Sequence, residues 1–372
     1  MMISRRSWMQ TLTTAGAGSL LLSPREVLRH LDQPTDEKLL DTSLVRLSSN
    51  ENPYSPSQAM VEAMSQMQAK ICRYPNADFA SLEEIIAERE GVPASQVVVT
   101  SGSREGLKAV GLMKAIQGGE IGCCLPTYRA LLTYAEMWGA DLRVSPLTED
   151  LQYNLAAIEE AISDKTSMVF VCNPNNPTGR LLPADELKAF CQRASQRTTV
   201  FVDEVYFDYI ETSGYPSMKS LIADDRDVII SRTLSKVYGL AGARIGYLMA
   251  NNETAATIRN TLMSGTNVLG IALGKAAFGD EEFKSFSLQK NRECKQLIYS
   301  TLSSLQLDYL ESHTNFVFFK TDRPITEVQQ AFKSSSVQVG RAFPPYMDWC
   351  RISTGKVEEV QEFCRAAREV FG

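Results

Sequence analysis

Lys236 lies in a stretch of residues that could hold and activate an aldehyde cofactor carrying a phosphate. In the stretch 231–246, the hydroxyl residues Thr233 and Ser235 precede the lysine, and Arg244 follows it eight residues later. A lysine amine can form a Schiff base with an aldehyde, while hydroxyls and an arginine can bind a phosphate. These are the requirements of an enzyme that uses pyridoxal 5'-phosphate (PLP). Taken alone, the segment also fits a solvated lysine between a strand and a turn.

Asp203 is the second residue that points to this cofactor. It ends the apolar run 199–203, and Tyr206 follows three residues later. An ionised carboxylate at the end of a buried strand is costly unless a cation pairs with it. The protonated pyridine nitrogen of PLP is such a cation, and Asp203 would raise the pKa of that nitrogen and keep the ring an electron sink. Tyr206 can reach the ring oxygen. Asn176, in the turn 173–180, can donate to the same oxygen, although turn formation alone would explain that segment.

Two further polar segments follow apolar runs that have strand character. Gly102, Ser103 and Arg104 come directly after the run 96–100 and open a helix, where backbone N–H groups and serine hydroxyls favour an anion. Tyr128 follows another run and offers an aromatic face to a flat ring. A simple helix cap and a core tyrosine are the alternatives. Open α/β sheets bind ligands at the carboxyl ends of their strands, so these segments are expected at one site.

The pattern of apolar residues predicts an α/β fold. From residue 57 onward, helical periods alternate with short apolar runs, most of them continuous, as in a parallel sheet buried on both faces. Beyond about residue 252, long amphipathic segments over 254–306, with a break near Gly265, precede a smaller α+β lobe. Helices are predicted at 157–162, 184–194, 325–334 and 356–371. Strands are predicted at 96–100, 120–125, 167–172, 199–203, 228–231, 245–249, 315–319 and 349–353.

Composition and charge exclude several classes of function. A chain of 372 residues can form a large core and two lobes. The net charge of −6 gives no basic surplus for binding nucleic acid. No apolar run reaches the roughly 18 residues that a membrane span requires. Only two histidines are present, His30 and His313, and the eight cysteines contain no CxxC pair. A zinc site or a Ser-His-Asp triad is therefore poorly supplied, and no metal is predicted.

The N-terminus suggests export. Paired arginines, Arg5 and Arg6, precede the weakly apolar segment 11–22, an arrangement that resembles a twin-arginine signal. Residues 1–23 are therefore predicted to be a signal segment, and the protein is expected in the periplasm. No clean A-x-A cleavage site follows, and a basic tail on a cytoplasmic protein is the alternative.

From about Arg46 to its C-terminus the chain resembles the fold-type I, class I/II aminotransferases, most closely the histidinol-phosphate aminotransferase type. Three motifs occur in the order and approximate spacing of that family: Asn176–Gly179, Asp203 with Tyr206, and Ser235–Lys236 with Arg244. The resemblance implies an aspartate aminotransferase-like fold. Its large PLP-binding domain, at 57–252, would contain a mostly parallel seven-stranded sheet flanked by helices. Residues 24–56 would form an arm contributing to a small domain at 253–372.

The resemblance also implies roles in cofactor binding. Lys236 would be the lysine bonded to the cofactor, and Asp203 the partner of the pyridine nitrogen. Asn176 and Tyr206 would contact the ring oxygen, and Tyr128 would stack on the ring. Arg104 stands where an acidic residue is common in the family. The phosphate would be bound by Gly102, Ser103, Arg104, Thr233, Ser235 and Arg244.

Further implied roles concern the substrate and a second subunit. Tyr74 matches a tyrosine that reaches the cofactor phosphate of the neighbouring subunit, which implies a homodimer. Arg351 matches the arginine that grips the substrate carboxylate with two guanidinium nitrogens. Asn176, Arg341 and Tyr54 are further candidates for contact with the substrate, and Arg341 could meet a phosphate or a carboxylate.

The implied reaction is ping-pong transamination between an amino acid, or a histidinol-phosphate-like amine, and a 2-oxo acid such as 2-oxoglutarate. Lys236 would act as the general base. A PLP-dependent decarboxylase or β-lyase on the same scaffold is an alternative, because the same residues would hold the cofactor. A non-catalytic exported binding protein is another. The aromatic segment 343–349 departs from the typical histidine-pathway pattern, so an aromatic or other amino acid is as plausible a donor as histidinol phosphate.

Overall fold

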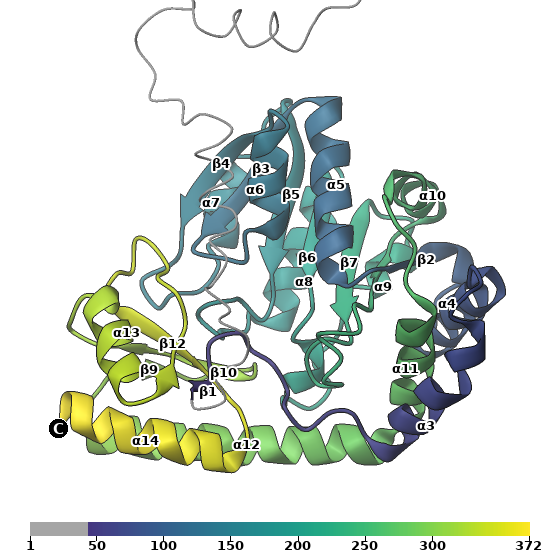
Figure 1. Cartoon of the computed structure of the whole chain (residues 1–372). Helices are drawn as coiled ribbons and strands as arrows, with labels where there is room; N and C mark the ends of the chain where they lie inside the picture. The colour runs from purple at the N-terminus through teal and green to yellow at the C-terminus, as the bar shows by residue number, and fades with distance from the viewer. Residues whose placement is uncertain (1–43) are drawn as a thin grey trace, which may run out of the picture. The chain divides into compact units, whose positions relative to one another are not determined.

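In the computed structural model, a seven-stranded sheet lies at the centre of the fold (Figure 1). Its strand order is β2-β8-β7-β6-β5-β3-β4. The structure describes residues 44–372. The predicted signal segment, 1–23, and part of the predicted arm, 24–43, lie outside the described residues. All pairings in the sheet are parallel except those of β8, which runs antiparallel to both of its neighbours. The predicted α/β fold with a mostly parallel sheet is confirmed.

The strands follow the predicted apolar runs closely, and four of them are buried along their whole length. The exception is a strand that the sequence did not predict, β4, which pairs only with β3 at the sheet edge and is mostly exposed. An edge strand of this kind needs no continuous apolar run. The strands of the large sheet are β2 (Val97–Thr100), β3 (Glu120–Leu125), β4 (Asp141–Pro146), β5 (Thr166–Cys172), β6 (Thr199–Asp203), β7 (Val228–Thr233) and β8 (Gly246–Met249).

The helices lie against this sheet or join it to the C-terminal part. The predicted helices at 184–194 and 325–334 are found with those bounds. The segments predicted over 254–306 are three helices. The predicted break near Gly265 is found between residues 261 and 268, and a second, unpredicted break falls at Asp280; Asn267 and Asp280 each accept a backbone N–H bond at the start of a new helix. The helices are α3 (Gln58–Gln66), α4 (Asn76–Glu90), α5 (Ser103–Gln117), α6 (Ala130–Met137), α7 (Leu155–Glu160), α8 (Ala184–Ala194), α9 (Ser220–Ala223), α10 (Asn252–Thr261), α11 (Val268–Gly279), α12 (Glu281–Ser304), α13 (Ile325–Ser334) and α14 (Val357–Phe371).

Two smaller sheets complete the described chain. One is antiparallel, in the order β12-β10-β9, and α12 and α14 run side by side next to it (Figure 1). The other is a parallel pair in which β1, at the start of the described residues, lies beside β11. This pair ties the arm before the large sheet to the C-terminal part. The strands are β1 (Val45–Arg46), β9 (Tyr309–Leu310), β10 (Phe316–Lys320), β11 (Val337–Gln338) and β12 (Trp349–Ser353).

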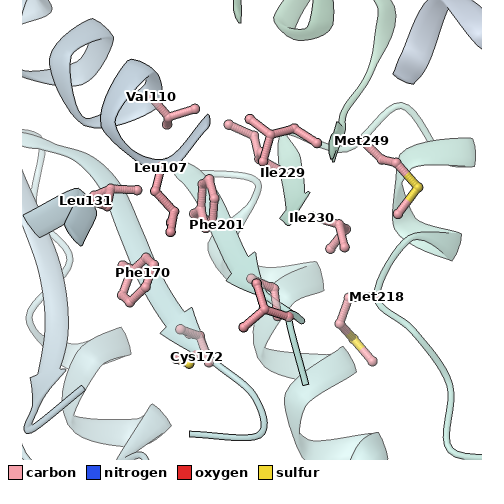
Figure 2. Packing of buried hydrophobic residues seen from close by; sticks show 14 of the residues in the cluster. Leu107, Val110, Leu131, Phe170, Cys172, Phe201, Met218, Ile229, Ile230 and Met249 are labelled. Carbon is pink, nitrogen blue, oxygen red and sulfur yellow. The ribbon is translucent and has the colours of Figure 1, made fainter. Parts of the chain in front are cut away.

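The buried apolar side chains form two clusters. The larger one lies around the seven-stranded sheet, where Leu107 and Val110 of α5 face residues of the central strands such as Phe201 (Figure 2). Burying one side chain of this size stabilises the fold by about 1.5–3 kcal/mol. The smaller cluster joins α12, α13 and α14 to the small sheets.

The clusters also bear on the predicted domain boundary at residue 252. Apolar residues of α10 and α11, such as Ile258 and Ile271, pack in the larger cluster, and the change to the smaller cluster falls within α12. Leu47, in the arm, belongs to the smaller cluster. Residues 44–372 all lie in one contact unit, so the boundaries at 56 and 252 stay predictions.

Candidate active site

The carboxyl ends of β5, β6 and β7 lie at one edge of the sheet because these strands are parallel neighbours. Asn176 follows β5, Asp203 ends β6, and Lys236 follows β7. The N-terminus of α5, which follows β2, reaches the same edge, because Thr100 and Thr233 both pair with Gly246. The fold therefore brings Asn176, Asp203 and Lys236 to the sheet edge where α5 begins with Ser103.

The Asp203 carboxylate is fully buried, with no exposed surface. Among the described residues, neither of its oxygens has a hydrogen bond of good geometry and no ion pair is formed with it. The Ser231 hydroxyl, opposite it on β7, and the Val205 backbone N–H lie close enough to lower its pKa, but less than burial raises it. Burial raises the pKa of Asp203 to about 7. A buried carboxylate without an ion-pair partner is costly, so this position fits a ligand that supplies a cationic N–H group. The pyridinium nitrogen of PLP is such a group.

Lys236 carries an amine that is easily deprotonated. Its Nζ donates to the backbone oxygen of Asn50 at 2.9 Å and lies 5.6 Å from the centre of the Tyr206 ring. Burial lowers the pKa of Lys236 to about 8, and the positive charge of Arg351 acts in the same direction. An amine with a pKa this close to neutrality can act as a nucleophile and as a general base.

The Tyr206 hydroxyl is held by two amide donors. Asn50 Nδ2 donates to it at 2.9 Å, and Asn176 Nδ2 donates to it at 3.3 Å. Burial raises the pKa of Tyr206, so the phenol keeps its proton. The predicted pair of Asn176 and Tyr206 is therefore in mutual contact and offers a hydroxyl proton to a ligand oxygen.

The Arg244 guanidinium lies against the backbone at the start of α5, where an anion is favoured. Gly102 has a φ of +79°, and a Cβ at this position would overlap the Arg244 guanidinium. Arg244 itself has a φ of +60° and donates to the Ala241 carbonyl at 2.8 Å. Ser103 is the first residue of the helix, whose free N–H groups favour an anion. Position 102 must therefore be glycine for the guanidinium to lie against the backbone.

The remaining predicted cofactor residues are Thr233, Ser235, Arg104 and Tyr128. The Thr233 hydroxyl accepts from the Ser235 backbone N–H at 3.1 Å, which fixes the turn before the lysine. Tyr128 is half-buried. Burial raises its pKa, with opposing effects from the charges of Arg104 and Asp203, so Tyr128 lies within electrostatic reach of both.

Arg351 is a buried cation whose polar partners are all neutral. It donates from Nη1 to Asn176 Oδ1 at 2.7 Å and from Nη2 to the Ser48 carbonyl. Within residues 44–372 no carboxylate forms a salt bridge with it, and its Nε has no hydrogen-bond partner. Burial lowers its pKa to about 10. A buried guanidinium with these contacts is suited to binding a carboxylate.

The other predicted substrate and interface residues lie in three places. Arg341 is exposed, and its guanidinium stands 4.3 Å from the centre of the buried Phe343 ring. The Tyr54 hydroxyl accepts from the Val357 backbone at 3.2 Å, at the start of α14. Tyr74 has 94% of its surface exposed. The proposed roles of these three residues toward a substrate or a second subunit stay predictions.

Asn50 is the site residue that the sequence analysis missed. It contacts both Lys236 and Tyr206 and is only 2% exposed. Its φ of +56° is a left-handed conformation that asparagine adopts more readily than most residues. The turn-rich segment 47–56 was the available signal, but the sequence does not reveal that this turn folds back onto the strand ends.

Membrane-spanning helices and metal sites are absent from residues 44–372. No helix in this range is long and apolar enough to cross a membrane. The same range contains no group of three or more histidine, cysteine, aspartate or glutamate side chains placed to hold a metal ion.

Comparisons with known proteins agree with this geometry. Residues 42–366 match the family model described as aminotransferase class I and II. The chain is 34% identical over 332 residues to histidinol-phosphate aminotransferase of Moorella thermoacetica, covering 88% of this chain and 86% of that protein.

Two solved structures are also similar. The first is a putative histidinol-phosphate aminotransferase from Erwinia carotovora atroseptica, with a TM-score of 0.83 and 28% identity over 88% of this chain and 95% of that one. The second is histidinol-phosphate aminotransferase from Sinorhizobium meliloti in complex with pyridoxal-5'-phosphate. Its TM-score is 0.83 and its identity 25%, over 95% of this chain and 98% of that one.

Proposed function

This chain belongs to the aminotransferase class I and II family, and we propose that it binds PLP and transfers an amino group between an amine donor and a 2-oxo acid. The observation that carries the proposal is the fully buried Asp203 carboxylate without an ion pair, at the same strand edge as the Lys236 amine. A protein that only needed Asp203 for its fold would be expected to pair it.

The residues of the site have complementary tasks in this reaction. PLP, when bound, supplies an electron sink for the substrate carbon that carries the amino group. Asp203 would keep the pyridine nitrogen protonated, and Tyr206 and Asn176 would hold the ring oxygen. The α5 N-terminus and Arg244 would hold the phosphate, and Lys236 would take and return the proton that moves during the transfer.

Arg351 favours transamination over decarboxylation. Asn176 and the Ser48 carbonyl fix two of its nitrogens, so the guanidinium is held in place before a substrate arrives. A substrate carboxylate that forms an ion pair with this guanidinium is stabilised as the anion. The ion pair therefore opposes loss of the carboxylate as carbon dioxide. The Lys236 amine is then the base available for the proton on the neighbouring carbon.

The acceptor we propose is a 2-oxo acid such as 2-oxoglutarate, in a ping-pong cycle. Histidinol phosphate is a candidate donor because of the relatives' names. The segment 343–349 is rich in aromatic residues, and the Arg341 guanidinium lies 4.3 Å from the centre of the Phe343 ring, so an aromatic amino acid is the second candidate donor.

A second copy of the chain is proposed to complete the site. Tyr74 is 94% exposed and the nearby Ile71 is 57% exposed, which suits a surface covered by another subunit. Light scattering of the purified protein would measure the homodimer.

Twin-arginine export to the periplasm is proposed from the N-terminal sequence alone. Replacement of Arg5 and Arg6 by lysine should retain the protein in the cytoplasm, as fractionation would show.

The reaction is tested with purified protein carrying bound PLP. Addition of an amine donor should convert the cofactor to its amine form, and 2-oxoglutarate should restore the visible band. A panel of donors including histidinol phosphate, phenylalanine and tyrosine then ranks substrates by kcat/KM. Lys236→Ala should abolish both turnover and the lysine-dependent band, whereas Lys165→Ala, at an exposed lysine, should change neither. Release of carbon dioxide in place of amino transfer would instead identify a decarboxylase.

A further inference from the structure

Asn50 stands out because every polar group on it is used within the site. Its backbone N–H donates to the Ser353 hydroxyl at 2.9 Å, and that hydroxyl donates to Asn50 Oδ1 at 2.8 Å. Its Nδ2 donates to the Tyr206 hydroxyl at 2.9 Å, and its backbone oxygen accepts from Lys236 at 2.9 Å. One residue of the arm thus contacts β12, the turn after β6 and the turn after β7.

Two chains of hydrogen bonds converge on the Tyr206 oxygen. In the first, Arg351 donates to Asn176 at 2.7 Å and Asn176 donates to Tyr206 at 3.3 Å. In the second, Ser353 donates to Asn50 and Asn50 donates to Tyr206. Arg351 and Ser353 are two residues apart on β12, so both project from the same face of that strand. Arg351 is linked to the Tyr206 phenol through the Asn176 amide, and Ser353 is linked to it through the Asn50 amide.

The direction of these bonds determines where the Tyr206 proton points. A hydroxyl oxygen has two acceptor positions and one proton to donate. Asn50 and Asn176 occupy both acceptor positions, so the O–H bond must point away from them. Donors that act in sequence also polarise one another, which makes the hydroxyl a stronger donor.

We propose that Asn50 is a positioning residue for the cofactor: it orients the Tyr206 hydroxyl toward the ring oxygen and couples that hydroxyl to β12, the strand that carries Arg351. The inference rests on the proposed function, because the ring oxygen is that of PLP. The Asn50 side chain acts through Tyr206, whereas its backbone oxygen, which accepts from Lys236, is kept in any substitution at this position.

The test is a pH titration of the visible absorbance of the enzyme with bound PLP and no substrate. Asn50→Gly removes both amide bonds, and glycine accepts the φ of +56°. With a weaker donor beside it, the ring oxygen becomes more basic and holds the chromophore's proton to higher pH. The midpoint of the titration should rise by about 0.5 to 1 unit, the effect of one ordinary hydrogen bond.

A second variant tests the same chain of bonds from its other end. Ser353→Ala leaves Asn50 in place but removes its hydroxyl partner, so the midpoint should rise in the same direction by a smaller amount. Asn291→Ala is the matched control, because Asn291 is also a buried asparagine and accepts from Thr354, next to Ser353. This control should lower the melting temperature and leave the midpoint unchanged.

Each outcome separates this inference from the proposed function. A wild-type protein that shows no visible band with PLP would contradict the proposed function itself. A wild-type band together with unchanged midpoints in Asn50→Gly and Ser353→Ala would overturn the role of Asn50. Loss of the cofactor from both folded variants would also overturn it, since neither residue is among those predicted to hold the phosphate and both variants should retain PLP.

Discussion

Asp203 and Glu204 are adjacent at the end of β6, and both are buried, yet their surroundings are opposite. Side chains alternate between the two faces of a sheet, so the two carboxylates point to different sides. Glu204 forms an ion pair with Arg232 at 2.8 Å and accepts from Ser217 and Met218 at 2.7 and 2.9 Å. Asp203 has no such partner among the described residues.

The strand beside them, β7, shows the same difference between its two sides. On β7, Ser231 lies opposite Asp203, and Arg232 follows it on the side of Glu204. The Arg232 guanidinium also stacks 3.9 Å from the centre of the Phe207 ring. On one face of the sheet the Glu204 charge is therefore neutralised by Arg232. On the other face the Asp203 charge would be neutralised only by a cationic ligand. At this strand end, burial alone does not distinguish the two carboxylates, whereas the ion pair does: Glu204 has one and Asp203 does not.

The largest difference between the two carboxylates should be seen in catalysis. Asp203→Asn should lower kcat/KM by roughly two to three orders of magnitude, because the cation it would pair with loses its partner in a buried site. The melting temperature of the cofactor-free variant should not fall, since the amide removes an unpaired charge. The comparison fails if Asp203→Asn destabilises the cofactor-free protein as strongly as a change at Glu204.

The opposite result is expected on the other side. Arg232→Met leaves Glu204 buried without a cation and should lower the free energy of unfolding by about 3–5 kcal/mol, measured by urea denaturation. The folded fraction should keep its activity. The double variant Glu204→Gln, Arg232→Met should recover part of the loss. Strictly additive losses would show that the pair is not coupled.

A smaller effect should appear in the pH dependence of stability without cofactor. The pKa of Asp203 is about 7 in the folded protein and about 3.9 in an unfolded chain. Between these values the folded state binds a proton that the unfolded state does not, so stability falls as pH rises from 4 to 7. Wild type should therefore lose melting temperature relative to Asp203→Asn between pH 5 and pH 8. Parallel curves for the two proteins would refute the raised pKa.

The sequence predicted the fold and the site best where a charged or polar residue follows directly after an apolar run. The apolar runs predicted the buried strands, and Asp203 and Lys236 were recognised because a carboxylate and a lysine at strand ends require partners. Edge strand β4 was missed because it is mostly exposed and has no continuous apolar run. The break near Gly265 was predicted and is found, whereas the second break in 254–306 depended on a cap at Asp280 that looks like an ordinary polar residue.

Asn50 was missed for a different physical reason. Its partners Tyr206, Lys236 and Ser353 are 156, 186 and 303 residues away in the sequence. No periodicity links positions so far apart, and only the folded arm brings them together. The same holds for the ion pair of Glu204 and Arg232, whose partners become neighbours because β6 and β7 pair in one register.

The arm also sets a limit on how far the chain can be shortened from its beginning. Val45 pairs with β11, the Ser48 carbonyl binds Arg351, and Asn50 joins Tyr206 and Lys236. A truncated protein that starts at residue 44 keeps all of these contacts. One that starts at residue 51 loses them, although it still contains Asp203, Tyr206 and Lys236. A peptidase that removes a signal must therefore cut before β1 if the site is to be kept. The same limit applies to the first residue chosen for expression.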